Sequence, residues 1–370
     1  MSIRFLHAAD FHLDSAFAGL SGEQAKQRRR ESRELPERLK DYVNQNGVDV
    51  VLLAGDLFDG NAVYRETLER LTAALGGMQA WVFLAPGNHD FWSPRSPCAA
   101  ADWPANVHVF RSRTIERVEL PELGCAVYGA AFTDAAQEES LLAGFAAPDD
   151  GLIHLMVLHG ELAAASRYDP VTPEQIAASG LDYLALGHTH SFGGVLRAGR
   201  TAYAWAGCPE GRGFDETGDK GFLAGEASPG EVDVTFVPFA RRRYWLLEPD
   251  VTGTTPEEAL RSVMPATAAD DLCRVVFRGE TDGLGVDIKS IQSRFAPDFF
   301  YLELRDETRV RQDVWARAGE DSLRGLFLRE LRARYDAAGE DERRGIERAV
   351  RFGLAALDGR DLWGLGGHSR

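Results

Sequence analysis

The chain has 370 residues, which is too long for one ordinary domain, so we expect two or three packed units. With 44% hydrophobic and 26% charged residues, its composition is that of a globular protein and excludes an intrinsically disordered one. A protein that binds nucleic acid without a partner usually has a basic surface, whereas this chain has a net charge of −16. Binding of nucleic acid would therefore need positive charge from metal ions or from a partner, and binding of a small substrate would not.

The first residues, MSIRFLHAADFHL, hold a single Arg and a short apolar run that Asp10 interrupts. This is neither a signal peptide nor a membrane span, so we expect a cytoplasmic protein with no membrane partner. The four cysteines lie far apart and form no CxxC pair, which argues against a zinc ribbon and a disulfide framework. We expect buried free thiols at Cys98, Cys125, Cys208 and Cys273.

The first two-thirds of the chain alternates short β-rich runs with helical stretches. Buried strands are expected at 3–7, 48–53, 81–84, 152–158 and 183–186, and helices at 23–46 and 64–75. Shorter strands are expected at 107–110, 114–119 and 125–130, and glycines divide 193–237 into hairpin-like segments. This order predicts an α/β core of layered sheets flanked by helices.

A domain boundary is expected near Pro238, followed by a small β/α unit. Its strands are predicted at 244–247, 272–278 and 299–304, with one helix capped by Thr254 or Thr255 and another at 287–295. The last segment is helical and carries two apolar stripes: Leu323, Leu326, Phe327, Leu331 and Tyr335, and then Ile346, Val350, Leu354 and Leu357. We therefore predict a core at 1–238, a capping domain at 239–310 and a helical segment at 311–370.

Five short polar segments each follow an apolar run that we expect to be a buried strand. They are Asp10-Phe11-His12, Gly55-Asp56, Gly87-Asn88-His89-Asp90, His159-Gly160 and Gly187-His188-Thr189-His190. Ligands of open α/β sheets bind in the crevice beyond the carboxyl ends of the strands, so these segments are expected to converge on one site. Five of the nine histidines lie in these segments, which a random scatter of core histidines would not produce.

The residue types in these segments favour a pair of divalent metal ions. Two carboxylates, one amide and four imidazoles, without a thiolate, suit Mn²⁺ or iron, with Zn²⁺ also open. Two ions about 3.5–4 Å apart need a shared ligand, and they lower the pKa of a bridging water that then attacks phosphorus. The other histidines are expected to be structural at His7, His108 and His154, and to lie in a tail at His368.

The five segments resemble the complete signature of the calcineurin-like metallophosphoesterases. The stretches LHAADFHLD, LLAGDLFD, APGNHD and YAWAGCPEGRGFDETGDKGF are similar to the SbcD/YhaO branch of DNA repair exonucleases. The resemblance covers the chain to about Val237, and beyond it extends only to the arrangement of elements. It implies a four-layer αββα sandwich with a small α+β cap domain and C-terminal helices.

The resemblance also implies a role for each polar residue. The implied ligands are Asp10, His12 and His190 for one ion, Asn88, His159 and His188 for the other, and Asp56 as the bridge. His89 would bind neither ion and would stabilise the transition state or protonate the leaving oxygen, while Asp90 would orient the His89 ring.

The leading hypothesis is a Mn²⁺-dependent DNA exonuclease or endonuclease subunit in DNA repair, whose C-terminal helices dock on an SMC-like coiled-coil ATPase. Whether the chain forms a homodimer stays open. The basic runs 26–30 and 241–243 are interpreted as solvated faces that only weakly indicate phosphate contacts. One alternative is a phosphodiesterase or phosphatase for a nucleotide or other small phosphoester, which the acidic charge favours. A non-catalytic scaffold is the other, and the acid-type residue His89 argues against it.

Overall fold

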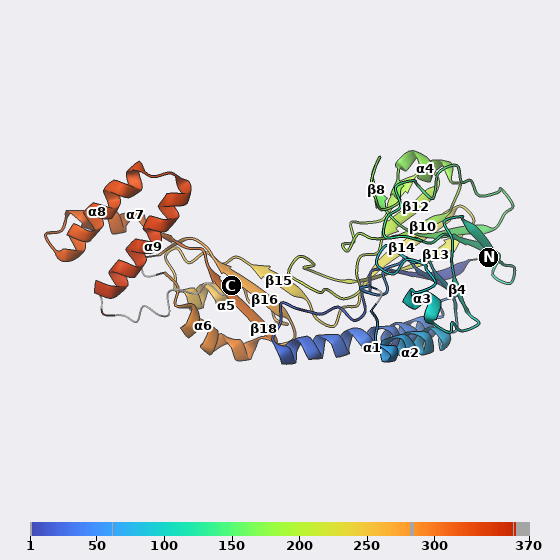
Figure 1. Cartoon of the computed structure of the whole chain (residues 1–370), viewed down its shortest axis with the longest axis horizontal. Helices are drawn as coiled ribbons and strands as arrows, with labels where there is room; N and C mark the ends of the chain where they lie inside the picture. The colour runs from blue at the N-terminus through green and yellow to red at the C-terminus, as the bar shows by residue number, and fades with distance from the viewer. Residues whose placement is uncertain (1, 61, 282–284, 358, 360–370) are drawn as a thin grey trace. The chain divides into compact units, whose positions relative to one another are not determined.

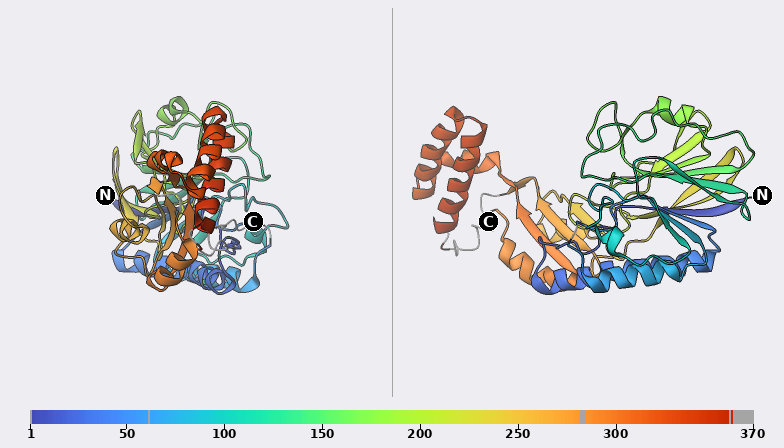
Figure 2. Two further views of the ribbon diagram at one scale, coloured as in Figure 1. Left: turned by 90° about the vertical axis from the view of Figure 1, so that its left-hand side faces the viewer. Right: turned by 45° about the vertical axis from the view of Figure 1, so that its right-hand side comes forward.

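The computed structural model describes residues 2–60, 62–281, 285–357 and 359, so His368 and the end of the predicted helical segment lie outside the described residues. The chain divides into two compact units, and the boundary in the sequence lies between Arg241 and Arg242. The first unit contains two large mixed sheets with helices, and the second a smaller sheet and further helices (Figures 1 and 2). The fold is mixed α/β, as the sequence predicts. The finer division at 238 and 310 remains a proposal.

The first large sheet joins strands from both ends of the first unit. In spatial order it comprises β14 (Glu231–Pro238), β13 (Gly221–Ser228), β1 (Ile3–Ala8), β2 (Val50–Leu53), β3 (Trp81–Leu84) and β4 (Val107–Val109). Strands β1 to β4 are parallel, β13 runs antiparallel to β1, and β14 runs antiparallel to β13. The carboxyl ends of β1, β2 and β3 therefore lie at one edge of this sheet.

The second large sheet has the same kind of parallel centre. Its order is β11 (Leu196–Ala198), β12 (Thr201–Trp205), β10 (Tyr183–Gly187), β7 (Ile153–His159), β6 (Cys125–Gly129) and β5 (Glu116–Leu120). Strands β12, β10, β7 and β6 are parallel, and the outer strands β11 and β5 are antiparallel to their neighbours. Strands β7 and β10 thus end side by side.

Apolar side chains fill the space between the two sheets and cover their outer faces. Phe5 of the first sheet and Val157 of the second belong to one buried cluster between them. Helices α1 (Gly22–Asn46) and α2 (Arg65–Gly76) cover the outer face of the first sheet, where Leu39 packs (Figure 1). Helix α4 (Pro173–Ala178) covers the second through Ile176. The result is the four-layer αββα arrangement.

Short elements complete the first unit, and their ends differ slightly from the prediction. They are α3 (Pro97–Ala100), β8 (Glu161–Leu162) and β9 (Pro170–Val171). Strand β5 begins at Glu116 and not at Thr114, because the Ser112 hydroxyl bonds the backbone of Thr114 and holds it in a turn. Such local side-chain bonds compete with the strand ladder.

The interpretation of residues 26–30 as a solvated face is wrong for the central residue, Arg28, which is buried. The guanidinium of Arg28 is fully buried and donates hydrogen bonds to Glu31 (2.9 Å), Glu210 (3.1 Å) and the carbonyl of Gly211 (2.9 Å). A buried charge needs such partners, because an unpaired one would be strongly destabilising. Arg242 in the other basic run is also buried and donates to the carbonyl of Asp270.

The second unit begins with a small parallel sheet. It contains β15 (Tyr244–Leu247), β16 (Leu272–Phe277) and β18 (Tyr301–Asp306), together with α5 (Pro256–Val263), α6 (Ile288–Phe295) and the 3₁₀ turn Ala296–Asp298. Strand β17 (Glu280–Thr281) pairs with β19 (Arg309–Val310). Of the two candidate caps, Thr255 caps α5 through a capping box with Glu258. Leu260, Phe277 and Phe295 lie in the core of this sheet and its helices.

The helical segment forms a separate small cluster. Its elements are α7 (Gln312–Ala316), the 3₁₀ turn Arg317–Gly319, α8 (Leu323–Ala337) and α9 (Glu340–Leu357). Val350 of α9 is buried against Leu328 of α8, whereas Leu323 and Leu326 of the predicted stripe are 69% and 57% exposed. None of the helices in the described part of the chain is both long and apolar enough to span a membrane.

Candidate metal centre

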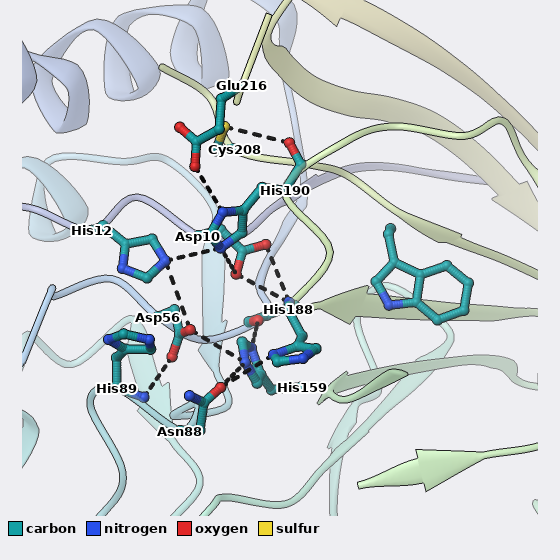
Figure 3. A network of polar contacts seen from close by, with 12 residues as sticks. Asp10, His12, Asp56, Asn88, His89, His159, His188, His190, Cys208 and Glu216 are labelled. Carbon is teal, nitrogen blue, oxygen red and sulfur yellow. Dashed lines mark hydrogen bonds and ion pairs between the residues drawn. The ribbon is translucent and has the colours of Figure 1, made fainter. Parts of the chain in front are cut away.

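The polar residues singled out in the sequence converge where the parallel strands of both sheets end. Asp10 and His12 follow β1, Asp56 follows β2, and Asn88 follows β3. In the second sheet the site residues are His159, which is the last residue of β7, and His188 and His190, which follow β10. Figure 3 shows these side chains pointing towards one another.

The backbone at these positions adopts conformations that are rare for residues other than glycine. Asp10, His12, Asp56 and His188 have positive φ angles of 55°, 42°, 52° and 93°. A non-glycine residue in such a conformation costs on the order of 1–3 kcal/mol, and these conformations cluster at functional sites. The chain therefore accepts local strain to turn these side chains inwards.

Gly187 allows the two sheets to approach each other beneath the site. A Cβ atom there would lie 1.8 Å from the carbonyl oxygen of Ala54, which also accepts a hydrogen bond from Nδ1 of His159 (2.9 Å). We expect Gly187→Ala to lower the free energy of unfolding by about 3 kcal/mol, because backbone must move to remove the overlap. The measurement is urea unfolding beside Gly193→Ala, where a Cβ meets nothing within 4 Å. Equal stability of the two variants would contradict this explanation.

The first group of donors contains Asp10, His12 and His190. The Nε2 atoms of His12 and His190 face each other at 3.2 Å, and Nε2 of His190 lies 3.9 Å from Asp10. The outer nitrogen Nδ1 of His12 lies 3.1 Å from Asp59, and that of His190 lies 2.8 Å from Glu216. Because carboxylates only accept, both Nδ1 atoms carry a proton, so in the neutral rings both Nε2 atoms are available to bind a cation. A cation between them would attract both nitrogens.

The second group contains Asn88, His159 and His188. The Oδ1 atom of Asn88 lies 2.9 Å from Nε2 of His159 and 3.2 Å from Nδ1 of His188. Asp56 lies between the groups, since its Oδ2 is 3.4 Å from Nε2 of His159 and 3.7 Å from Nε2 of His12. This is the position that a shared carboxylate requires.

The electrostatics of the cluster favour positive charge. Burial raises the pKa of Asp10 to about 6. Burial lowers the pKa of His159, but the charges of Asp56 and Asp10 raise it more, to about 9. Burial likewise raises the pKa of Asp56, yet the contacts with His159 and His12 hold it well below its usual range. Carboxylates that stabilise a buried imidazolium in this way would also stabilise a metal cation.

The donor set fits divalent metal ions. Donor atoms of Asp10, His12 and His190 lie within 4.8 Å of one another, as do those of Asp10, Asp56 and His159. The ligand types are carboxylate and imidazole, which suit first-row divalent ions. The chemistry of the residues therefore supports a metal centre of the kind that the sequence predicts.

His89 stands beside this cluster and differs from its members in being exposed. Its backbone amide donates to Oδ1 of Asp56 (2.9 Å), and its ring meets the ring of His12 edge to face, with centroids 4.8 Å apart. A donor atom of His89 also falls within 4.8 Å of those of His12 and Asp56. The side chain is thus placed to reach both the cluster and a molecule bound on it.

The expectation that Asp90 orients the His89 ring is wrong. Asp90 is fully buried, and its carboxylate accepts hydrogen bonds from the backbone amides of Gly87 (2.7 Å), Leu57 (2.7 Å) and Asp56 (3.2 Å). None of its hydrogen bonds among the described residues goes to the His89 ring. Asp90 instead ties the loop after β3 to the loop after β2, because backbone amides at both turns need an acceptor.

The remaining described histidines and the cysteines are structural, as expected. His7 is buried and contacts the Tyr183 hydroxyl (2.9 Å), and His154 contacts the Tyr128 hydroxyl (3.1 Å). His108 lies 3.2 Å from Glu116. All four cysteines are buried and free.

Five residues that contact the site among the described residues were not predicted from the sequence to take part. Asp59 contacts His12, Glu216 and Arg212 contact His190, Glu161 lies 3.9 Å from His188, and the Tyr168 ring lies 4.6 Å from the His188 ring. The stretch 203–222 stands out in the sequence as a whole, but no pattern within it distinguishes Glu216 from the neighbouring acidic residues. Glu161 and Tyr168 follow the His159-Gly160 segment, but no pattern in the sequence distinguishes either residue.

The layered fold and the His/Asp cluster together define a metallophosphoesterase. Residues 3–192, more than half of the chain, match the family model described as Calcineurin-like phosphoesterase. The chain belongs to this family, whose members use divalent metal ions.

Two curated relatives are similar to a large part of the chain. The first is the uncharacterized metallophosphoesterase YhaO of Bacillus subtilis (strain 168), which is 34% identical over 254 residues, covering 63% of this chain and 60% of the relative. The second is the SbcD component of the nuclease SbcCD from the same organism, which is 26% identical over 275 residues, covering 62% of this chain and 67% of the relative. The matched region thus spans less than two-thirds of the length of YhaO.

Proposed function

We propose that this chain is the nuclease subunit of a DNA repair complex and hydrolyses phosphodiester bonds in DNA as an exonuclease or endonuclease with Mn²⁺. The observation that carries the proposal is the position of Asp56 between two groups of metal-type donors. The similarity to a relative named as part of a nuclease supports the choice of substrate.

The proposed ligand sets follow the two groups of donors. They are Asp10, His12 and His190 for one ion, Asn88, His159 and His188 for the other, and Asp56 for both. Two divalent ions at these positions would supply Lewis acidity and an activated water at neutral pH. The backbone amide of His89 fixes Asp56, and the exposed His89 ring is placed to give a proton to the leaving oxygen.

A partner protein would supply the affinity for DNA that the acidic chain lacks. With a net charge of −16, the protein has little general attraction for a polyanion, so we propose that an SMC-like coiled-coil ATPase provides much of the grip on DNA. The exposed side chains of Leu323 and Leu326 on α8 support the helical segment as the docking region. Homodimer formation and a cytoplasmic location belong to the same proposal.

The acidic charge favours one alternative, a phosphodiesterase or phosphatase for a nucleotide or another small phosphoester. The same donor groups serve that reaction, and a small anion needs no extended basic surface. A non-catalytic scaffold is less well supported, since a structural metal site has no need of the exposed imidazole of His89 beside it.

A substrate panel distinguishes these functions. With Mn²⁺ we expect labelled duplex DNA to be degraded, together with weaker turnover of an aryl phosphodiester, and we expect EDTA to abolish both activities. The matched control is His108→Gln, which changes a histidine outside the cluster and should cleave as the wild type does. Turnover of cyclic nucleotides or the aryl ester with intact DNA would favour the small-phosphoester alternative.

A further inference from the structure

The histidines of the metal centre differ in what holds their outer ring nitrogens. His12 and His190 donate from Nδ1 to the carboxylates of Asp59 (3.1 Å) and Glu216 (2.8 Å). His159 donates from Nδ1 to the carbonyl of Ala54 (2.9 Å). The first two histidines therefore have charged acceptors, and the third a neutral one.

His188 is held differently again. Its Nδ1 faces Asn88 at 3.2 Å, and its outer Nε2 lies 3.9 Å from Glu161, beyond hydrogen-bonding distance. The Glu161 side chain is 37% exposed, so solvent screens this pair. Among the described residues, the outer nitrogen of His188 therefore has no carboxylate within hydrogen-bonding distance, unlike those of His12 and His190.

One guanidinium joins the two carboxylates behind the first group. Arg212 donates to Oε1 of Glu216 (2.8 Å) and to Oδ1 of Asp59 (3.2 Å), and its backbone amide donates to Oε2 of Glu216 (2.7 Å). Its Nη2 also lies 3.1 Å from Nδ1 of His190. The 2.8 Å contact between that Nδ1 and an acceptor-only oxygen requires the proton on Nδ1, so in the neutral ring Nε2 is the nitrogen that can bind a metal ion.

Of the two carboxylates, Glu216 is the more buried and makes the shorter hydrogen bond to its histidine. Glu216 is 5% exposed, whereas the Asp59 side chain is 39% exposed. Glu216 accepts hydrogen bonds from Nδ1 of His190 (2.8 Å) and from the side chain and backbone amide of Arg212. These donors suit a carboxylate in its ionised form. A carboxylate hydrogen-bonded to a metal-binding imidazole fixes its tautomer and raises its basicity.

We propose that Asp59, Glu216 and Arg212 form a positioning frame that makes the two metal positions unequal, with the ion at Asp10, His12 and His190 bound more tightly. This inference rests on the ligand assignment of the proposed function. The primary ligands act in the same direction, because the first group contributes the anionic Asp10 where the second contributes the neutral Asn88. The frame adds carboxylate acceptors for the outer ring nitrogens on the first side, where His159 on the second side has a neutral carbonyl.

The test is calorimetric titration of the metal-free full chain with Mn²⁺. For the wild type we expect two binding steps of different affinity. Glu216→Gln should weaken the tighter step by about 10–100-fold, and Asp59→Asn should weaken it less, while the weaker step changes little. Thermal unfolding of each metal-free variant shows whether the fold is kept. Should Glu216→Gln not fold, the half-exposed Asp59 still supplies the test.

The matched control is Glu119→Gln, which removes an exposed carboxylate from an ion pair with Arg117 on β5. It should leave both steps unchanged. Variants that weaken both steps equally, or neither, would overturn the positioning frame. A wild type that binds fewer than two ions would overturn the ligand assignment itself, so failure of the frame and failure of the proposed function give different results.

Discussion

The variant His89→Gln is expected to keep its metal ions and to lose about 10²–10⁴-fold in the rate of phosphodiester cleavage. His89 is exposed beside the cluster, and its backbone amide, which a Gln would retain, is what fixes Asp56. Only the ring that we propose as the proton donor to the leaving oxygen is removed. The measurement pairs initial rates of cleavage with the Mn²⁺ content of the purified variant.

Two outcomes would correct this assignment in different ways. If His89→Gln loses Mn²⁺ along with activity, His89 is a metal ligand. Its donor atom lies within 4.8 Å of those of His12 and Asp56, which is close enough for that role. If cleavage continues unchanged, the leaving oxygen receives its proton from another source. His108→Gln provides the reference for a histidine replaced away from the cluster.

The second large effect is expected from Asp56→Asn, which should reduce binding of both ions and lower cleavage by at least about 10³-fold. The Oδ2 atom of Asp56 lies between His159 (3.4 Å) and His12 (3.7 Å), so neutralising it removes the anionic donor common to both groups. Metal content after dialysis against Mn²⁺, with cleavage rates, measures the effect.

The comparison for Asp56→Asn is Asp10→Asn, which removes a carboxylate from one group only. We expect Asp10→Asn to retain about half of the wild-type Mn²⁺ content, because the other ion keeps its ligands, whereas Asp56→Asn retains little. Equal metal loss in the two variants would mean that Asp56 is not shared between two ions.

The sequence predicts the buried strands and the cluster well, because apolar runs such as 48–53 and 81–84 are followed at once by Gly and polar residues. Parallel strands with buried faces produce this pattern directly. Asp90 has the same local pattern but a different role, since its contacts depend on which backbone amides the loop after β2 presents. No local signal contains that information.

Long-range partners explain the other differences. Arg28 looks like part of a solvated basic run until Glu210, 182 positions further along the chain, is folded against it. Glu216 likewise meets His190 only because the segment after β12 returns to the site. In α8 the apolar side chain of Leu328 is buried, and Phe327, Leu331 and Tyr335 of the predicted stripe pack partly buried against the same cluster. Leu323 and Leu326 of that stripe are exposed.

The hydrogen bond from the backbone amide of His188 to Oδ1 of Asp10 (3.0 Å) joins a loop of one sheet to a loop of the other across the seam of the sandwich. Cations bound there would link the two sheets, because each proposed ligand set contains residues from both sheets. By mass action, a cation at a thousand times its dissociation constant adds about 4 kcal/mol to the stability of the folded state. Depletion of the metal would therefore destabilise the fold as well as stop the proposed reaction.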